Sequence, residues 1–376
     1  MEQRSSRRKN GPVLQAIRHS VRFFRNYKQW NNRTFIVVLL ASVVISMLLT
    51  LLVEGARGIS LSSSDPSSTH QQSSSQAKNA ETEQETSARI MANGDLLYHD
   101  IIYISAKKSD GTYDFHDNFE YVKPWLKQAD LVLGDFEGTV NKDHYLAGYP
   151  LFNAPGEVMD AIKDAGYQVL DLAHNHILDS QIEGVVSTAD AIEKAGMTPI
   201  GVYTHEPRDK APIVIKEVNG IKVAILAYSY GFNGIEQSIS QEDYNRYLSD
   251  LDEDKMKAEI ERAEKEADIT IIMPQMGVEY QIEPTEEQKK LYHKMIDWGA
   301  DIIFGGHPHV VEPAETVEKE GDKKLIIYSM GNFISNQRIE TMQDVENAKW
   351  TERGVLMDVT IKKKAGKTTI ETAKAH

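Results

Sequence analysis

Residues 302–313 read IIFGGHPHVVEP, an apolar run followed by two glycines and by two histidines one residue apart. The apolar run is typical of a buried strand, and Gly305 and Gly306 allow a tight turn after it. Taken alone, His307 and His309 are either metal ligands or polar residues in an ordinary strand-to-loop corner. Only the residues elsewhere in the chain can distinguish between these two interpretations.

Similar apolar runs recur from residue 89 onward and alternate with amphipathic stretches. We predict strands at 89–95, 130–137, 167–174, 222–229, 268–277, 301–309, 324–333 and 354–363, and helices at 119–129, 156–166, 182–196, 256–267 and 285–299. Alternation of this kind predicts a layered α/β domain in which helices cover the sheets.

Polar side chains follow these predicted strands where each strand ends. They are Asp95, then Asp135 and Glu137, then His174, Asn175 and His176, then Gln275, and finally His307 and His309. An aspartate after a strand is most often a turn or helix-capping residue, and a lone histidine is most often structural. In α/β proteins, however, ligands bind beyond the carboxyl ends of the strands. Because many predicted strands here end in polar side chains of this kind, we predict that these side chains form a common site.

These side chains favour a divalent cation. The chain has no cysteine, so a metal has to be held by His, Asp, Glu and Asn. Carboxylate and imidazole ligands suit Mn, Fe or Zn. We therefore predict one or two such ions.

The N-terminal region has a different character. Residues 1–33 carry nine Lys/Arg against Glu2 alone, a local balance of +8, which leaves −22 for the remainder out of a total of −14. The uncharged run FIVVLLASVVISMLLTLLV that follows is long enough to cross a hydrocarbon core of roughly 30 Å. We predict a basic cytoplasmic segment at 1–33 and a transmembrane anchor at 34–54, because Lys/Arg-rich flanks stay inside. A cleaved signal peptide is the alternative, although this apolar run is longer than is typical of one.

Residues 55–88 are rich in serine and poor in large apolar side chains, so we expect a disordered linker there. Residues 89–376 would then form an extracellular domain of a single-pass protein of the bacterial cell membrane. The strongly acidic body argues against nucleic acid as a partner.

The ordered motifs GD (94–95), GDFE (134–137), HNH with LD (174–179), MGVEY (276–280), GHPHVVEP (306–313) and YSMGNF (328–333) resemble one known family. These are the capsule synthesis CapA proteins, also called poly-γ-glutamate biosynthesis proteins, which are related to the calcineurin-like metallophosphatases. The resemblance covers about residues 89–336. It implies an α/β fold, namely a four-layer metallophosphatase-like β-sandwich flanked by helices, here preceded by one transmembrane helix.

The resemblance also implies roles for individual residues. Asp95 and His309 would bind a first metal, Asp135 would bridge two metals, and Asn175 and His307 would bind the second. His176 would protonate the leaving group, with its tautomer held by Asp179. His99, Glu137, His174 and Gln275 are further candidate ligands. Histidines one residue apart can serve neighbouring ions only if the backbone kinks at Pro308.

Two positions depart from the metallophosphatase pattern. Leu97 stands where a histidine is expected, and Gln275 stands where the capsule branch usually has another histidine. A glutamine offers only a neutral amide oxygen, which is a poorer ligand than imidazole. The pattern therefore puts a full two-metal site in doubt and favours one occupied site.

Two functions remain open at this point. One is a role in the biosynthesis or export of an anionic envelope polymer such as poly-γ-glutamate, beside membrane polymer-synthase subunits. The other is metal-dependent hydrolysis of a phosphoester, or of a bond in an envelope polymer.

Overall fold

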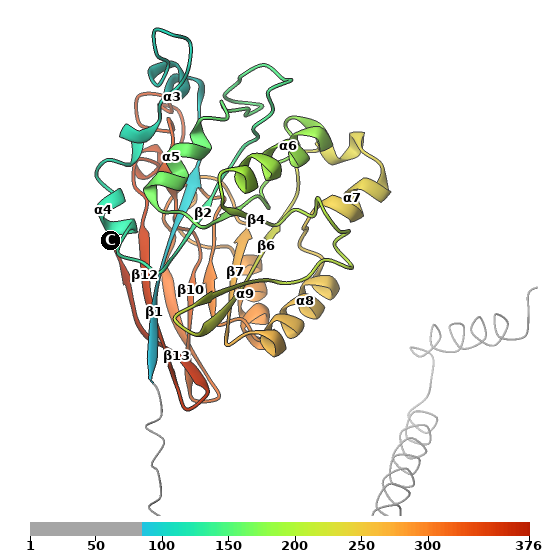
Figure 1. Cartoon of the computed structure of the whole chain (residues 1–376), viewed down its shortest axis with the longest axis vertical. Helices are drawn as coiled ribbons and strands as arrows, with labels where there is room; N and C mark the ends of the chain where they lie inside the picture. The colour runs from blue at the N-terminus through green and yellow to red at the C-terminus, as the bar shows by residue number, and fades with distance from the viewer. Residues whose placement is uncertain (1–84) are drawn as a thin grey trace, which may run out of the picture. The chain divides into compact units, whose positions relative to one another are not determined.

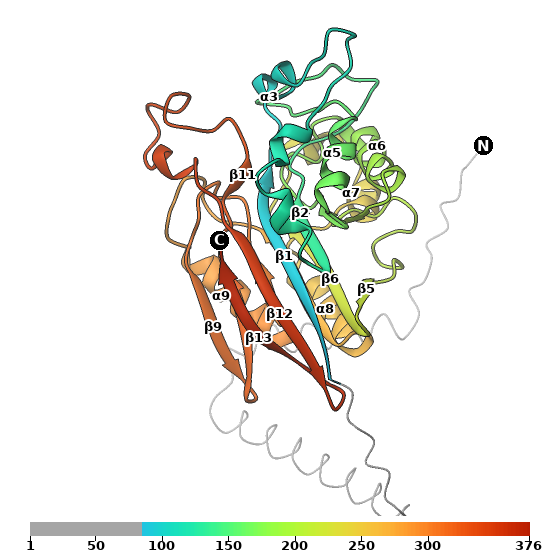
Figure 2. The same ribbon diagram turned by 60° about the vertical axis from the view of Figure 1, so that its left-hand side comes forward.

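The computed structural model of this protein describes residues 85–376, which form two β-sheets with flanking helices. The first sheet has the strand order β13-β12-β1-β2-β3-β4, and β11 pairs with β1 off this path. Its strands are β1 (Thr86–Leu96), β2 (Leu131–Asp135), β3 (Val169–Asp171), β4 (Thr198–Ile200), β11 (Asn332–Ile334), β12 (Leu356–Lys364) and β13 (Lys367–Ala375). Figure 2 shows the long strands β1, β12 and β13 side by side.

The second sheet has the order β5-β6-β7-β8-β10-β9. Its strands are β5 (Val214–Val218), β6 (Ile221–Ser229), β7 (Ile269–Gln275), β8 (Ile302–Phe304), β9 (Ala314–Lys319) and β10 (Asp322–Ile327). The central strands β6, β7 and β8 are parallel, as are β1, β2, β3 and β4 in the first sheet.

Helices lie on the outer face of each sheet. The longer ones are α5 (Val158–Ala165), α6 (Gln181–Lys194), α8 (Glu253–Glu266) and α9 (Glu286–Trp298). The shorter ones are α3 (Asp100–Ser105), η2 (His116–Phe119), α4 (Lys123–Leu126), η3 (Ile235–Ser238), α7 (Gln241–Tyr247) and η4 (Ala348–Trp350). In Figure 1, β1 runs upward toward the end of the domain at which α3 lies.

Alternating side chains of the strands build three apolar layers. Ile90 in β1 and Ile271 in β7 belong to one core cluster, which includes residues of both sheets and lies between them. Met91 points the other way and packs with apolar residues of α5 and α6. Ile272 likewise joins apolar residues of α8 and α9. The period-2 alternation of a strand thus produces a helix–sheet–sheet–helix order, as expected from the sequence.

The structure differs from the sequence-based expectation at several elements. It adds the strands β4, β5, β9 and β13 and the helices α3 and α7 to those predicted. The helix expected at 119–129 is reduced to α4, because Pro124 has no N–H to donate inside a helix and is accommodated only in its first turn. The strand expected at 324–333 is divided into β10 and β11, which belong to different sheets. Strand β1 begins at Thr86, so the end of the predicted linker is paired with β12.

Within residues 85–376, none of the helices has the length and apolarity needed to span a membrane. The predicted cytoplasmic segment at 1–33, the anchor at 34–54 and most of the linker at 55–88 lie outside the described residues.

Candidate metal centre

The site forms where parallel strands of both sheets end. Asp95, near the end of β1, is the register partner of Asp135, which is the last residue of β2. Asp135 is in turn the partner of Asp171 at the end of β3. In the second sheet β7 ends at Gln275, which forms an isolated bridge with Gly306 just beyond β8. The strand ends of the two sheets therefore bring together residues as far apart in the sequence as Asp95 and His309, which are 214 positions apart.

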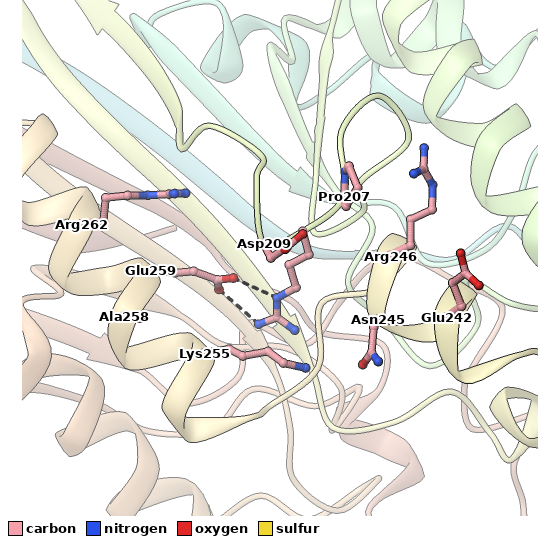
Figure 3. A pocket seen from close by; sticks show the side chains of 10 residues that line it. Pro207, Asp209, Glu242, Asn245, Arg246, Lys255, Ala258, Glu259 and Arg262 are labelled. Carbon is pink, nitrogen blue, oxygen red and sulfur yellow. Dashed lines mark hydrogen bonds and ion pairs between the residues drawn. The ribbon is translucent and has the colours of Figure 1, made fainter. Parts of the chain in front are cut away.

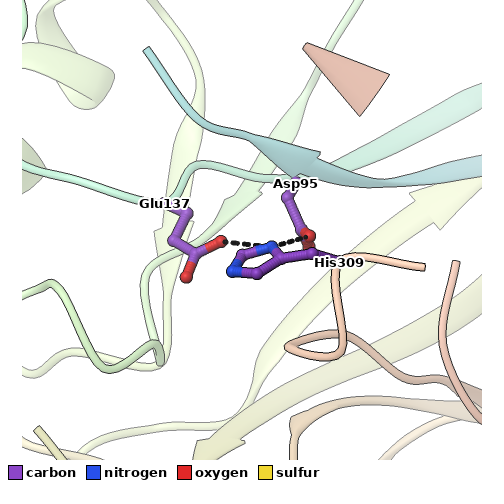
Figure 4. A group of neighbouring side chains, drawn as sticks. All are labelled: Asp95, Glu137 and His309. Carbon is purple, nitrogen blue, oxygen red and sulfur yellow. Dashed lines mark hydrogen bonds and ion pairs between the residues drawn. The ribbon is translucent and has the colours of Figure 1, made fainter. Parts of the chain in front are cut away.

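Three side chains come close enough to share one ion. Asp95, Glu137 and His309 each offer a ligand atom, and these atoms all lie within 4.8 Å of one another. His309 Nδ1 lies 2.8 Å from Asp95 Oδ2 and 3.8 Å from Glu137 Oε2 (Figure 4). All three are buried. Asp95, Glu137 and His309, with Asp135 beside them, form a group that we call the acidic half of the site.

The acidic half contains buried polar atoms that have no hydrogen-bond partner. They are Asp95 Oδ1, Asp135 Oδ1 and Glu137 Oε2. The backbone of Gly306 lies beneath two of these carboxylates, because a Cβ there would be 3.1 Å from Asp135 Oδ2 and 3.5 Å from Asp95 Oδ1. Buried carboxylate oxygens without partners are costly, and a divalent cation would satisfy them. The residues present therefore fit a metal ion.

The pKa values of this group reflect the crowding of negative charge. Burial raises the pKa of Asp135 well above its usual range, and so do Asp171, Asp95 and Glu137. Burial raises the pKa of Glu137 to about 7, although the charge of His309 opposes this. Burial lowers the pKa of His309, but Glu137 and Asp95 outweigh it and raise that pKa to about 9. The pocket therefore favours positive charge at its centre.

The backbone kinks around Pro308, as the sequence argument required. His307 has φ 97° and His309 has φ 59°, conformations that non-glycine residues rarely adopt. Strained backbone of this kind concentrates at functional sites. The ring of His307 packs 4.5 Å from that of Tyr230, and its buried Nδ1 has no hydrogen-bond partner. The two imidazole rings lie 6.1 Å apart.

Asn175 and Gln275 lie together on the other side of Glu137 and bond to each other twice. Gln275 Oε1 accepts from the backbone N–H of Asn175 at 2.7 Å, and Gln275 Nε2 donates to Asn175 Oδ1 at 3.2 Å. Gln275 Nε2 also donates to Glu137 Oε1 at 3.2 Å. Ser229 Oγ lies 3.3 Å from Gln275 Oε1 and 2.9 Å from the carbonyl of Gly231, so its one hydroxyl hydrogen is shared between these two acceptors. We call Asn175, Ser229 and Gln275 the amide half of the site.

His176 and Asp179 form a buried pair next to this site. His176 Nδ1 lies 2.8 Å from Asp179 Oδ2, which also accepts from the backbone N–H of Phe152 at 2.6 Å. Burial lowers the pKa of His176, but the hydrogen bond that the ring donates to Asp179 and the charge of Glu137 outweigh it, so the net shift is upward. Asp179 thus orients the imidazole and leaves Nε2 free.

The two other candidate histidines are engaged elsewhere. His99 Nδ1 lies 3.2 Å from the carbonyl of Leu97 and accepts from the backbone N–H of Asn336 at 3.2 Å. The ring of His174 lies between two backbone N–H groups, with Nε2 3.4 Å from that of Gly138 and Nδ1 3.2 Å from that of His176. Neither ring belongs to the Asp95, Glu137 and His309 group.

Asp171 and Glu312 are buried close to the site, although neither was among the residues predicted from the sequence. Asp171 follows an apolar run just as Asp135 does, and that shared pattern could have identified it. Glu312 Oε2 accepts from Gln288 Nε2 at 2.9 Å, and the same nitrogen donates to the carbonyl of Met276 at 3.0 Å. This contact ties the loop after His309 to the loop after β7.

A cavity of about 700 Å³ lies elsewhere, between α7, α8 and the segment around Pro207 (Figure 3). Its buried Arg208 donates from Nε to Glu259 at 2.9 Å and pairs with Asp250 at 2.5 Å. These bonds satisfy the guanidinium internally, so that its charge is not free for a ligand. None of the predicted site residues lines this cavity, and the chemistry of the domain is therefore better sought at the strand ends.

Comparison with known proteins agrees with the motifs. Residues 89–337 match the family described as bacterial capsule synthesis protein PGA_cap. The chain is 34% identical over 228 residues to the capsule biosynthesis protein CapA of Bacillus anthracis, a match that covers 58% of this chain and 54% of that protein. It is 31% identical over 223 residues to the PGA biosynthesis protein CapA of Bacillus subtilis, covering 58% and 57%. The chain spans little more than half the length of these relatives.

Solved structures give weaker likenesses. A protein described as a 5′-nucleotidase from Staphylococcus aureus has a TM-score of 0.48 at 14% identity and covers 77% of this chain and 54% of its own. Sulfate thiohydrolase SoxB of Thermus thermophilus has a TM-score of 0.40 at 12% identity and covers 69% and 41%. These similarities are too low to carry an argument about the site.

The family assignment therefore rests on the sequence match, which extends over well over half of the chain and includes every residue of the acidic and amide halves. This chain belongs to the bacterial capsule synthesis protein family PGA_cap.

Proposed function

We propose that this protein acts at the bacterial cell surface in the biosynthesis or export of an anionic envelope polymer such as poly-γ-glutamate, with a divalent cation in the acidic half of its site. The single observation that carries the cation is the buried group of Asp95, Glu137 and His309 with its unpaired oxygens. Membership of the capsule synthesis family supports the polymer role.

The cation would also reconcile two facts about charge. The chain beyond residue 33 carries −22, and a polyanion would be repelled from such a surface. A divalent cation among Asp95, Asp135 and Glu137 would offset negative charge at the strand ends, where an anionic group could then approach. Mn, Fe or Zn suits this set of carboxylate and imidazole ligands.

The predicted anchor at 34–54 would hold the domain outside the membrane, beside the polymer-synthase subunits that we propose as partners. The part of the predicted linker that precedes β1, residues 55–85, would give the domain reach along the surface. Labelling of intact cells with a membrane-impermeant lysine reagent tests this topology. Labelling of the domain would support it, and labelling only after lysis would contradict it.

The polymer role is tested by replacing the chromosomal gene with a Glu137→Gln variant and measuring surface polymer. The variant keeps the size of the side chain and removes its charge, so we expect polymer to be lost while the protein is still present. Glu312→Gln is the matched control, because Glu312 is a buried glutamate outside the acidic half. Unchanged polymer in the Glu137→Gln strain would contradict the proposal.

A second function, metal-dependent hydrolysis of a phosphoester or of a polymer bond, is favoured by the pair of His176 and Asp179. A divalent cation bound nearby would polarise the phosphoryl or carbonyl oxygen of a substrate. His176, held through Nδ1 by Asp179, would present Nε2 for proton transfer to the leaving group. Phe152 packs 4.7 Å from the ring of His176 and limits its movement.

The hydrolytic function is tested with manganese-loaded protein and an activated phosphoester such as p-nitrophenyl phosphate. We expect His176→Asn to lower turnover by roughly 10²–10⁴-fold, with little change in cation affinity. Absence of turnover by the loaded wild-type protein on phosphoester and polymer substrates would reject hydrolysis and leave the polymer role standing.

A further inference from the structure

The buried carboxamide of Gln275 has a fixed orientation. Its Oε1 accepts from the backbone N–H of Asn175 at 2.7 Å and lies 3.3 Å from Ser229 Oγ, whose hydroxyl is closer to the carbonyl of Gly231 at 2.9 Å. If the amide were turned over, its NH₂ group would face that backbone N–H, and two donors would then oppose each other. The position of the Asn175 backbone therefore determines which way the amide points.

With Oε1 fixed, the NH₂ group faces two potential ligand oxygens. It donates to Glu137 Oε1 and to Asn175 Oδ1, each at 3.2 Å. Asn175 is held in this orientation in turn, because its Nδ2 donates to Asn233 Oδ1 at 3.1 Å. The two amide hydrogens of Gln275 therefore occupy lone pairs of Glu137 Oε1 and Asn175 Oδ1. A cation bound between these two oxygens would need the same lone pairs.

We infer that the amide group of Gln275 takes the place of a second cation and limits the site to one. The inference rests on the proposed cation in the acidic half. It adds that Gln275 is the residue that limits the number of bound ions to one. The contrast between the two halves supports it, since Glu137 Oε2 on the acidic side has no hydrogen-bond partner whereas Glu137 Oε1 on the amide side accepts from Gln275 Nε2.

Gln275 cannot easily become a ligand in its present setting. To present Oε1 to an ion, the side chain would have to leave the buried backbone N–H of Asn175 without an acceptor, which is unfavourable. An amide oxygen is also a weaker ligand than imidazole or carboxylate for Mn, Fe or Zn. A residue that accepts from the same N–H and carries a second ligand atom would remove this limit.

The test is manganese binding by the full-length chain, stripped with chelator and then reloaded in equilibrium dialysis. We expect one Mn²⁺ per wild-type chain and a mononuclear electron paramagnetic resonance signal. Gln275→His and the isosteric Gln275→Glu should each bind two and show an exchange-coupled signal. Gln275→Leu, which removes the donor without adding a ligand, should remain at one. Circular dichroism identifies the variants that are folded.

Two tightly bound ions in the wild-type protein would overturn the inference, and so would a single ion in both folded Gln275→His and folded Gln275→Glu. The wild-type stoichiometry is decisive even if neither variant folds. A wild-type protein that binds no ion at all would instead refute the proposed cation site, so the two failures are distinguishable.

Discussion

The acidic and amide halves of the site share Glu137 but satisfy their polar atoms in opposite ways. In the acidic half, three carboxylates converge and each leaves a buried oxygen without a partner. In the amide half, both atoms of the Gln275 carboxamide are bonded, and so are both atoms of the Asn175 side chain. The comparison teaches that ligand-type residues alone do not make a metal site. The oxygens also have to be left free by their neighbours.

The most sensitive way to test this contrast is to remove the cation. The unpaired oxygens of Asp95 and Glu137 should make the folded state depend on it, because an ion that binds only the native state stabilises that state. At about 1,000 times the dissociation constant this amounts to about 4 kcal/mol. For a domain of this size we expect the melting temperature to rise by roughly 10 °C between chelator and saturating Mn²⁺. Equal melting temperatures would show that the acidic half needs no ion.

The next largest effect should follow from Glu137→Gln. The substitution removes one charged ligand of the acidic half, and we expect cation affinity to fall by about 100-fold, which corresponds to about 2.7 kcal/mol. Isothermal titration with Mn²⁺ measures this change. Glu312→Gln is the matched control and should bind as the wild type does. Equal losses in the two variants would mean that Glu137 acts only through the fold.

Glu312 itself sharpens the comparison. Its buried Oε1 also has no hydrogen-bond partner, but Glu312 lies outside the acidic half and is not a predicted ligand. Burial raises the pKa of Glu312 to about 7, although the hydrogen bond from Gln288 opposes this. The folded state then binds this proton more tightly than the unfolded state, so stability falls as pH rises from about 4.5 to about 7. We expect Glu312→Gln to gain about 2 kcal/mol at pH 8 and little at pH 4.

Urea unfolding at the two pH values measures that difference. The gain should appear both in chelator and in Mn²⁺, because Glu312 lies outside the acidic half. A gain that vanished in Mn²⁺ would place Glu312 among the ligands.

The smallest effect should come from Ser229→Ala in the amide half. The loss of the hydrogen bond that the Ser229 hydroxyl shares between the carbonyl of Gly231 and Gln275 Oε1 should cost about 1 kcal/mol of stability. The backbone N–H of Asn175 still holds Gln275, so cation affinity should change less than twofold. Chemical unfolding and Mn²⁺ titration of the same sample measure both quantities. A large change in affinity would show that the two halves are coupled.

Much of the site could be predicted from the sequence because it follows from topology. Apolar runs that end in Asp95, Asp135, Asn175 and Gln275 end in the same region of the domain, and local pattern is enough to locate such ends. The kink between His307 and His309 was expected on the condition that both rings serve as ligands of neighbouring ions, and the positive φ values of the two residues agree with it. These features depend on residues adjacent in the chain and on the common direction of the parallel strands.

The remaining features depend on atoms distant in sequence. The orientation of Gln275 is set by a backbone N–H 100 residues earlier, and no local pattern encodes that contact. Glu137 joins Asp95 and His309 only because β1, β2 and the loop after β8 meet in space. The division of residues 324–333 between two sheets is equally a matter of tertiary pairing, because both parts are apolar enough for either sheet.

The most direct test of the account is a crystal of the full-length chain loaded with Mn²⁺ and measured at the manganese absorption edge. The account predicts one anomalous peak at this site, in contact with the carboxylates of Asp95 and Glu137 and with the ring of His309. It also predicts that Gln275 Nε2 still donates to Asn175 Oδ1. A peak between Asn175 and Gln275, or no peak among the three acidic-half ligands, would contradict it.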